Sequence, residues 1–409
     1  MKPFWIVLLL PVAVWAAETP DLPPQAQVLA ALKNHPVVKA AEAGLRVETA
    51  NRDQLVAGPY EFALTLASQR RRERSADITT RDHEFGIERG IRLPGKAARD
   101  AEIGAAGIAQ AEFALGDALH ESGRLLLRSW FDWLREGSAV REWSGQVEVL
   151  RATDQAVRKK VSAGETARLE ALLSEAQLAQ AEAQLAQAQT RHERTASEMQ
   201  QHFPGIDLPE KPVLPEPVAL ENEAAIWRER ILEHNHELAV ARTEAQRARL
   251  LAQRRDDDRL PDPTLGLKLA SERDGQERIV GLQLTIPLPG AARAAQARAG
   301  TAGAEAANAR EAGVLSKAEA EARRTIAQAS AAHAQWRRLA AVAARMEDNA
   351  RLLEKAWRLG EGQFGDLQAA RRQSIEARLV AIQAQLDANE ARYRLLLDAH
   401  RLWPFDADD

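Results

Sequence analysis

The residues most suggestive of chemistry form the run Gly90-Ile-Arg-Leu-Pro-Gly-Lys96-Ala97, which nearly spells the glycine-rich loop that binds nucleotide phosphates. In that loop a serine or threonine after the lysine holds Mg²⁺, but Ala97 has no hydroxyl. A similar run, Gly290-Ala-Ala-Arg293, lacks the lysine. We therefore expect no nucleotide site and interpret both runs as corners where a strand gives way to a helix, because proline ends a strand. The corner residues are Pro94, Gly95, Pro289 and Gly290.

Histidine is the other side chain that could bind a ligand here. His234 and His236 are two residues apart and so do not share a helix face, and His192-Glu193 lacks zinc-protease spacing. We expect these side chains to be solvated, and His35 and His236 to cap or pack the start of a helix. The chain has no cysteine, which excludes disulfides and thiolate metal sites. No Ser/His/Asp or paired-carboxylate set stands out, so we expect no enzyme, no cofactor and no metal site.

The N-terminus has the features of an export signal. Lys2 precedes an apolar run from Phe4 to Val14, and small side chains follow, so we expect a signal peptide over residues 1–16. Its removal deletes one lysine and changes the formal charge from −4 to −5. Such a small charge gives no global basic field, so we expect no nucleic acid partner. No later apolar run reaches about eighteen residues, so a membrane span would have to consist of strands.

Two copies of one pattern make up the rest of the chain. Three landmarks recur in the same order at spacings of about 195 to 201 residues. These pairs are Asn34-His35 with Asn235-His236, Gly86–Gly95 with Gly281–Gly290, and Gly164-Glu165 with Gly360-Glu361. We place repeat 1 at 17–203, repeat 2 at 222–409, and an extended connector at 204–221, because its prolines exclude a regular helix.

Each copy is expected to contain a helix, two short strands, a very long helix and a returning helix. The first copy has these elements at about 25–57, 59–69, 82–93, 95–162 and 166–202. The second has them at about 222–257, 263–271, 278–288, 291–359 and 366–402. A segment of roughly 65 residues would form a helix of about 100 Å. A bend or interruption is expected near Gly137, and Leu178 and Leu185 among alanines indicate coiled-coil-like packing.

The strand segments alternate between apolar residues and small or polar ones. Leu265, Leu267 and Leu269 share one face, for example, whereas Gly266 and Lys268 share the other. This pattern is typical of a membrane barrel, with lipid outside and water inside, and also of a soluble sheet half-buried against helices. Four strands cannot close a barrel, so lipid-facing strands would have to be pooled between chains. Arg89 breaks the apolar face, and the loop from Arg70 to Arg74 is expected to be aqueous, with contact to acidic lipopolysaccharide as the alternative.

This order of elements resembles the outer-membrane efflux protein (TolC-like) family over essentially the whole mature chain. The resemblance implies a mainly α fold with a small β part, in which long antiparallel helical hairpins form a periplasmic tunnel. It also implies a homotrimer whose four strands per chain form one 12-stranded outer-membrane β-barrel. The implied partners are outer-membrane lipid, a periplasmic adaptor and an inner-membrane pump of the resistance–nodulation–division type. The compact length is similar to that of heavy-metal exporters of the cobalt–zinc–cadmium type.

In this family, acidic residues shortly after the helix-turn glycine narrow the periplasmic mouth. Counting six residues from each glycine gives Glu170 and Asp366 as aperture candidates, and an ordinary acid at a helix start is the alternative. The turns themselves, Gly164-Glu165 and Gly360-Glu361, are the implied docking points for the adaptor. Gly362 and Trp357 stand where the best-known member has an arginine and a tyrosine that latch the mouth, so a latch here would be built differently.

Two functions therefore follow from the sequence. The first is a passive outer-membrane duct that exports metal ions or small toxic molecules. The second is a soluble periplasmic helical adaptor or scaffold without a barrel. The strands discriminate between them, because they face lipid in the first and a protein core in the second. The transported substrate stays open, since a duct need not bind what passes through it.

Overall fold

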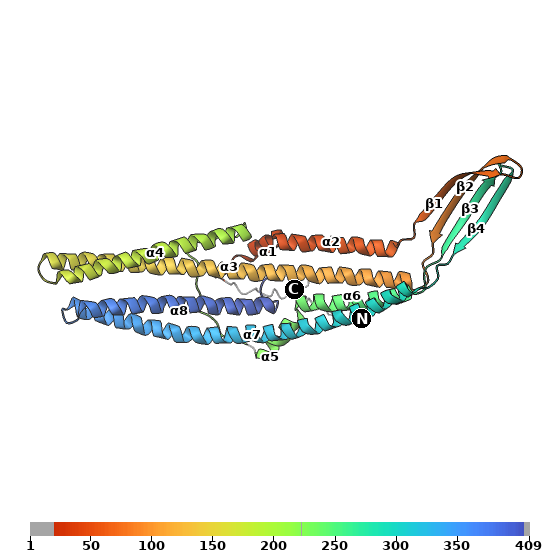
Figure 1. Cartoon of the computed structure of the whole chain (residues 1–409). Helices are drawn as coiled ribbons and strands as arrows, with labels where there is room; N and C mark the ends of the chain where they lie inside the picture. The colour runs from red at the N-terminus through yellow and green to blue at the C-terminus, as the bar shows by residue number, and fades with distance from the viewer. Residues whose placement is uncertain (1–19, 222, 405–409) are drawn as a thin grey trace, which may run out of the picture. The chain divides into compact units, whose positions relative to one another are not determined.

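The computed structural model describes residues 20–221 and 223–404. The predicted signal peptide, residues 1–16, lies outside this described part. The chain is mainly helical and carries one small sheet, as expected (Figure 1). Both halves have the same order of two short helices, two strands, one very long helix and one returning helix. The first half comprises α1 (Gln25–Asn34), α2 (Pro36–Ala57), β1 (Phe62–Glu73), β2 (Ile78–Gly90), α3 (Lys96–Ser162) and α4 (Arg168–His202). The second comprises α5 (Ala224–Glu233), α6 (His236–Asp257), β3 (Thr264–Glu272), β4 (Glu277–Thr285), α7 (Ala291–Arg358) and α8 (Phe364–Asp398).

The first helix of each half is divided in two, where the sequence pattern predicted one continuous helix. His35 has an extended backbone with a ψ angle of 136°, as expected for a residue that precedes a proline. In the second half Asn235 is extended, and its side chain accepts a hydrogen bond from the backbone N–H of Leu238 at 2.7 Å. This cap satisfies one of the free N–H groups at the start of α6. His236 therefore begins a helix, as expected, but Asn235 provides the cap.

The helix α3 continues for 67 residues without the predicted interruption at Gly137. A Cβ placed on Gly137 would lie 2.9 Å from the imidazole of His192 on α4. The glycine thus allows the His192 ring to lie against the α3 backbone, where any larger residue would displace it. The prediction of an interruption was wrong because a glycine that makes room for a neighbour need not break a helix.

The described residues form two compact units, which are considered separately. One unit contains residues up to Ala31, Arg128–Ala219 and Ala332–Glu390. Its α3–α4 seam is formed by Val147, Leu150 and Ala181, with Leu178 and Leu185 packed against them. The predicted leucine seam is therefore a packing surface between these two helices.

The connector is held in the same unit by hydrogen bonds to α8. The Gln385 amide donates to the carbonyl oxygens of Leu214 (3.1 Å) and Pro215 (3.0 Å), and the Asn389 amide also donates to Pro215 (3.0 Å). Between Asp207 and Glu221 the connector contains no helix or strand, as its prolines predict. Side chains of α8 thus satisfy backbone carbonyls that have no ladder partner.

The other unit contains Leu32–Leu127, Leu220–Ala331 and the residues from Ala391 onward. It carries an antiparallel sheet in the order β1-β2-β3-β4, with β1 and β4 at the edges. Strand β1 starts and ends later than predicted, because Arg70–Glu73 pair with Ile78–Arg81. The expectation that Arg70–Arg74 forms a loop was therefore wrong for all but Arg74. Residues 70–73 are all charged, so the alternation of apolar residues that predicted the strand ends before the strand itself does.

Candidate functional site: an amphipathic sheet and two helix-tip turns

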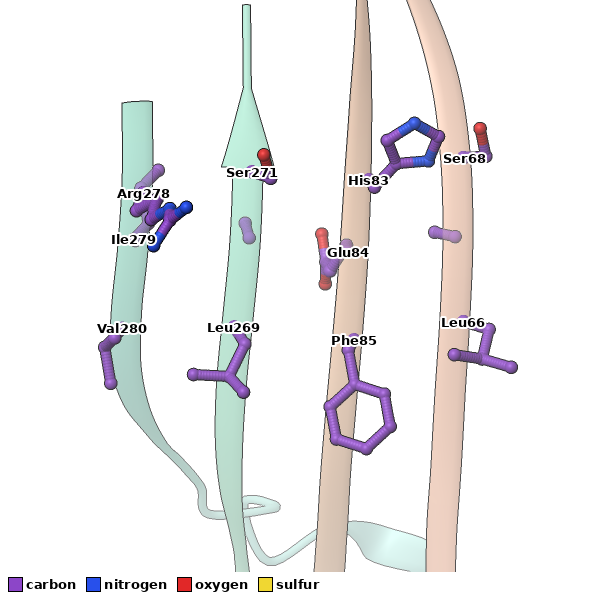
Figure 2. Close-up of a pocket in the computed structure, with 12 residues that line it drawn as sticks. Leu66, Ser68, His83, Glu84, Phe85, Leu269, Ser271, Arg278, Ile279 and Val280 are labelled. Atoms are coloured by element: carbon purple, nitrogen blue, oxygen red, sulfur yellow. The ribbon is translucent and has the colours of Figure 1, made fainter. Parts of the chain in front are cut away.

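One face of the sheet is almost wholly apolar. Because side chains alternate across a strand, the pairing register places every second residue in rows that cross all four strands. The first row is Phe62, Arg89, Leu265 and Leu284, the second is Leu64, Ile87, Leu267 and Leu282, and the third is Leu66, Phe85, Leu269 and Val280. Figure 2 shows the third row, with Ser68, His83, Ser271 and Arg278 above it, around a pocket of about 650 Å³.

These apolar side chains are exposed in the single chain. Leu282 is 82% exposed, Val280 74% and Leu66 72%. A soluble protein rarely leaves a contiguous apolar patch of this kind uncovered. Within the described residues the sheet therefore lacks the buried face that the alternative of a half-buried soluble sheet requires.

The opposite face is small and polar. Gly86, Gly266 and Gly281 lie there, and the Lys268 ammonium pairs with the Glu84 carboxylate at 2.7 Å. Nearer the hairpin ends, Arg71 pairs with Asp82 (3.0 Å) and Glu272 (2.8 Å) across the strands. The charges of Lys268 and Arg71 are thus neutralised by cross-strand partners, which suits a surface that faces water.

Arg89 interrupts the apolar face at its first row. Its Nε donates to the backbone carbonyl of Tyr60 at 2.7 Å, and its guanidinium lies 4.9 Å from the centroid of the Phe62 ring. The charge is therefore held against an aromatic ring and a carbonyl, at the end of the sheet where the helices begin. One hydrogen bond and one cation–π contact within the protein thus stabilise the cation at this edge.

The corner at Pro94-Gly95 is fixed by a buried lysine. Lys96, the residue that suggested a nucleotide loop, is 2% exposed, and its ammonium contacts the carboxylates of Asp258 and Asp262, each at 3.0 Å. It also donates to the backbone carbonyl of Leu260 at 2.7 Å. Lys96 thus joins the start of α3 to the segment before β3, and its ammonium is fully used in doing so. At the second corner, Arg293 donates to the carbonyl of Asp258 at 3.0 Å.

Asp262 collects three hydrogen bonds at this corner, just outside the strands. Its carboxylate accepts from the Tyr60 hydroxyl (2.5 Å), the Leu93 backbone N–H (3.0 Å) and Lys96. Burial opposes its ionisation, but these bonds together hold the pKa of Asp262 below its ordinary value. Burial and the neighbouring carboxylate raise the pKa of Tyr60 to about 12. The sequence did not single out Asp262, because its partners are far from it along the chain.

Both helix-tip turns have the same geometry. Gly164 and Gly360 have φ angles of 75° and 78° respectively, in the left-handed region that glycine adopts without strain. Each turn has the two hydrogen bonds of a Schellman motif. These are Glu165 N–H to Lys160 O (2.9 Å), Gly164 N–H to Val161 O (3.1 Å), Glu361 N–H to Ala356 O (2.9 Å) and Gly360 N–H to Trp357 O (3.1 Å). The repeated Gly-Glu pairs are therefore two copies of one helix stop.

Gly360→Ala is expected to destabilise its unit by about 1–2 kcal/mol, because alanine in a left-handed conformation places its Cβ against the carbonyl oxygen. The matched control is Gly313→Ala in the interior of α7, where an added Cβ meets nothing within 4 Å. The control should stabilise the protein by about 0.5–1 kcal/mol. Urea unfolding midpoints of the two variants would show the opposite signs, and two shifts of equal sign would contradict the turn geometry.

Glu170 and Asp366 occupy matching positions in the two hairpins. Each is the third residue of its helix, six residues after the turn glycine. Asp366 is exposed and Glu170 is half-buried. Both carboxylates lie at the positive end of a helix dipole, which stabilises them there. Their position is compatible with an aperture and with a simple helix start, so the aperture assignment stays a prediction.

Trp357 lies at the centre of the contacts around the turns. The Lys160 ammonium from α3 lies 4.6 Å from the centroid of the Trp357 ring, and the Phe364 ring lies 5.5 Å from it. Farther from the turns, the buried Arg371 donates to the Thr153 hydroxyl (2.8 Å) and pairs with Glu354 (3.2 Å). These contacts link α3, α7 and α8. Sequence reasoning noted Trp357 but missed its contact with Lys160, which lies about 200 residues away along the chain.

Four histidines gather in the other unit. The ring of His400 lies 5.6 Å from His120, 4.9 Å from His236 and 5.1 Å from His234. The prediction that His234 and His236 are simply solvated was wrong for His236, which is half-buried in this cluster. Between residues 20 and 404, residue 222 aside, no three His, Asp or Glu side chains are arranged to hold a metal ion.

Stability of this unit is expected to fall as the pH drops below 6.5. Burial, then the positive charge of Arg124 and the neighbouring His400, lower the pKa of His120 well below 6.5. The unfolded chain therefore binds a proton at a pH where the native His120 does not, so acid favours unfolding. Urea unfolding at neutral pH and at about pH 5 would measure the loss. His120→Gln should reduce this pH dependence, whereas His333→Gln should leave it unchanged, because His333 belongs to the other unit, where its ring lies 5.7 Å from that of Trp336.

No helix among the described residues is long and apolar enough to cross a membrane. No protein-family model matches the chain, and no curated protein matches it.

Solved structures do match. A membrane protein from Pseudomonas aeruginosa matches with a TM-score of 0.79 at 14% identity, over 98% of this chain and 99% of that one. The outer membrane protein VceC from Vibrio cholerae matches with a TM-score of 0.77 at 15% identity, over 93% and 97% of the two chains. The Campylobacter jejuni CmeC outer membrane channel matches with a TM-score of 0.77 at 13% identity, over 93% and 86%. The predicted resemblance is thus confirmed for the fold, which this chain shares with outer-membrane channels.

Proposed function

We propose that this protein is a subunit of an outer-membrane channel that serves as a passive export duct. The observation that carries the proposal is the sheet, which has one exposed apolar face, one polar face with paired charges, and two open edges. Lipid is the environment that covers such an apolar face favourably, and water suits the other face. The shared fold with outer-membrane channels supports the same assignment.

The open edges β1 and β4 require further copies of the chain. An unpaired strand edge in a bilayer leaves N–H and C=O groups without partners, so only closed barrels span membranes. A barrel of about eight strands has an interior filled by its own side chains, whereas larger barrels enclose a channel. Two copies of this sheet would therefore leave no passage. Three copies supply the twelve strands that the family resemblance implies, so we propose a homotrimer.

The helices would then line the periplasmic part of the duct. We propose that the Gly164-Glu165 and Gly360-Glu361 turns meet a periplasmic adaptor, which links the duct to an inner-membrane pump of the resistance–nodulation–division type. The duct itself would be passive, without catalysis or a cofactor, and the pump would supply energy. Metal ions or small toxic molecules are the proposed substrates.

Membrane fractionation followed by conductance recording tests the proposal. The protein should be recovered with the outer membrane and should require detergent for extraction. After incorporation into a planar lipid bilayer, it should give discrete conductance steps. Recovery in the soluble periplasmic fraction would overturn the channel and favour the soluble adaptor or scaffold.

The aperture residues make a separate prediction. Rings of carboxylates at a constriction attract divalent cations, so Ca²⁺ or Mg²⁺ should block the single-channel current of the native protein. Replacing Glu170 and Asp366 by Ala should weaken this block by roughly tenfold or more, as expected when a ring of charges is lost. Glu347→Ala combined with Asp348→Ala, on the exposed surface of α7, is the charge-matched control. Block that is unchanged in the aperture variant would remove these two residues from the constriction.

A further inference from the structure

Beyond the apolar rows, the same face of the sheet becomes basic. The next row is Ser68, His83, Ser271 and Arg278, and the row after it contains Arg70 and Arg81, which pair directly across β1 and β2. Figure 2 shows Ser68, His83, Ser271 and Arg278 beside the apolar row of Leu66, Phe85, Leu269 and Val280. We refer to Arg70, Arg81 and Arg278 as the basic row residues.

The arginines on the two faces of the sheet differ in whether they form ion pairs. On the polar face, Arg71 is neutralised by Asp82 and Glu272. On the apolar face, the exposed guanidinium groups of Arg70, Arg81 and Arg278 make no ion pair with any described residue. Unneutralised positive charge thus lies on the side of the sheet that carries the apolar rows.

The pairing of Arg70 with Arg81 is unfavourable by itself. Like charges placed directly opposite each other on neighbouring strands destabilise a sheet. An anion between them removes this repulsion, and the planar guanidinium matches a phosphate group through two parallel hydrogen bonds. The pair therefore favours a phosphate-bearing ligand.

The spacing between these rows matches the thickness of the lipid headgroup region. Successive rows are about 7 Å apart along a strand, which becomes roughly 5 Å of depth at the tilt of a membrane strand. Arg278 and the Arg70–Arg81 pair would then lie about 5 Å and 10 Å beyond the last apolar row. The headgroup region on each side of a bilayer is roughly 5–8 Å deep, and arginine side chains can reach several ångströms along it.

We propose that the basic row residues bind the phosphate groups of anionic lipids surrounding the outer end of the sheet. This inference rests on the proposed function, since it requires the apolar face to contact lipid. It adds a specific partner, a lipid headgroup with net negative charge on its phosphate groups, and three residues that select it over a lipid without net charge.

The test uses the full-length protein purified in neutral detergent and mixed with phosphatidylcholine, phosphatidylglycerol or diphosphoryl lipid A. Lipid retained by the protein after gel filtration is then quantified. The native protein should retain the two anionic lipids in preference to phosphatidylcholine. The triple variant R70Q/R81Q/R278Q should bind them roughly 10- to 100-fold more weakly, with unchanged retention of phosphatidylcholine.

Two further variants keep the result interpretable. R337Q/R338Q/R345Q removes three exposed arginines from α7 and should bind lipid as the native protein does. R70K/R81K/R278K keeps the charges but loses the paired guanidinium hydrogen bonds, so it should bind more tightly than the Gln variant and less tightly than the native protein. Such intermediate binding also shows that the positions tolerate substitution.

The outcomes separate the possible failures. Unchanged anionic lipid binding by the Gln variant would overturn the inference and leave the channel proposal intact. Displacement of the lipids by inorganic phosphate at equal phosphate concentration would also overturn it, because the site would then bind free anions. A native protein that retains no lipid of any kind and stays in solution without detergent would overturn the proposed function itself.

Discussion

A chain carrying Leu282→Arg is expected to be lost from the outer membrane as an assembled protein. Leu282 lies in the middle of the three apolar rows and is 82% exposed in the single chain. Arginine facing lipid at the bilayer midplane costs about 2–4 kcal/mol, and a trimer bears that cost three times. The sum is comparable to the whole stability of a typical domain. The measurement is the amount of detergent-extracted trimer in outer-membrane fractions.

Its matched control is Gln283→Arg, one residue along the same strand. Gln283 is exposed and lies on the polar face, opposite Gly266. A charge there would face water, so assembly should stay within about twofold of the native amount, since such lumen positions tolerate charge. Equal assembly of both variants would show that the apolar face does not contact lipid.

The second large effect is expected from Asp398→Ala in the helical part. The Asp398 side chain is 2% exposed and pairs with Arg124 (2.9 Å) and Arg394 (3.2 Å), while His120 lies 3.7 Å away. Burial opposes the charge on Arg124, but the Asp398 carboxylate holds the pKa of this guanidinium above its ordinary value. Removing the carboxylate leaves positive charge buried without compensation, which typically costs about 3–5 kcal/mol.

Glu121→Ala provides the comparison, because Glu121 also pairs with Arg124 but is 54% exposed. An exposed pair contributes only about 0–1 kcal/mol. Urea unfolding followed by tryptophan fluorescence should therefore show a large loss of stability for Asp398→Ala and a small one for Glu121→Ala. Similar losses would mean that Asp398 does not anchor this network.

Much of this fold could be predicted from local patterns in the sequence. The Gly-Glu pairs mark true helix stops, because a left-handed glycine followed by a new helix start is a short-range signal. The alternation from Leu265 to Leu269 correctly identifies a strand and its apolar face. Both signals depend only on neighbouring residues, so they are visible without the structure.

What escaped prediction depends on contacts between distant residues. In the sequence Lys96 resembles the lysine of a phosphate-binding loop, but in the structure its ammonium contacts the carboxylates of Asp258 and Asp262. His236 was judged with its neighbour His234, yet its ring lies 4.9 Å from that of His400. The alternation also could not decide whether the apolar face meets protein or lipid, because both environments select the same residues.

Disulfide cross-linking between the edge strands tests the central claim most directly, since the chain has no cysteine of its own. Thr65→Cys on β1 would be combined in turn with a cysteine at Ile279, Gly281, Gln283 or Thr285, which share one face of β4. If three copies close one barrel, at least one combination should give covalent dimers and trimers in outer membranes, but neither single variant should give trimers. Only monomers from all four combinations, in membranes that contain the protein, would contradict a sheet shared between chains.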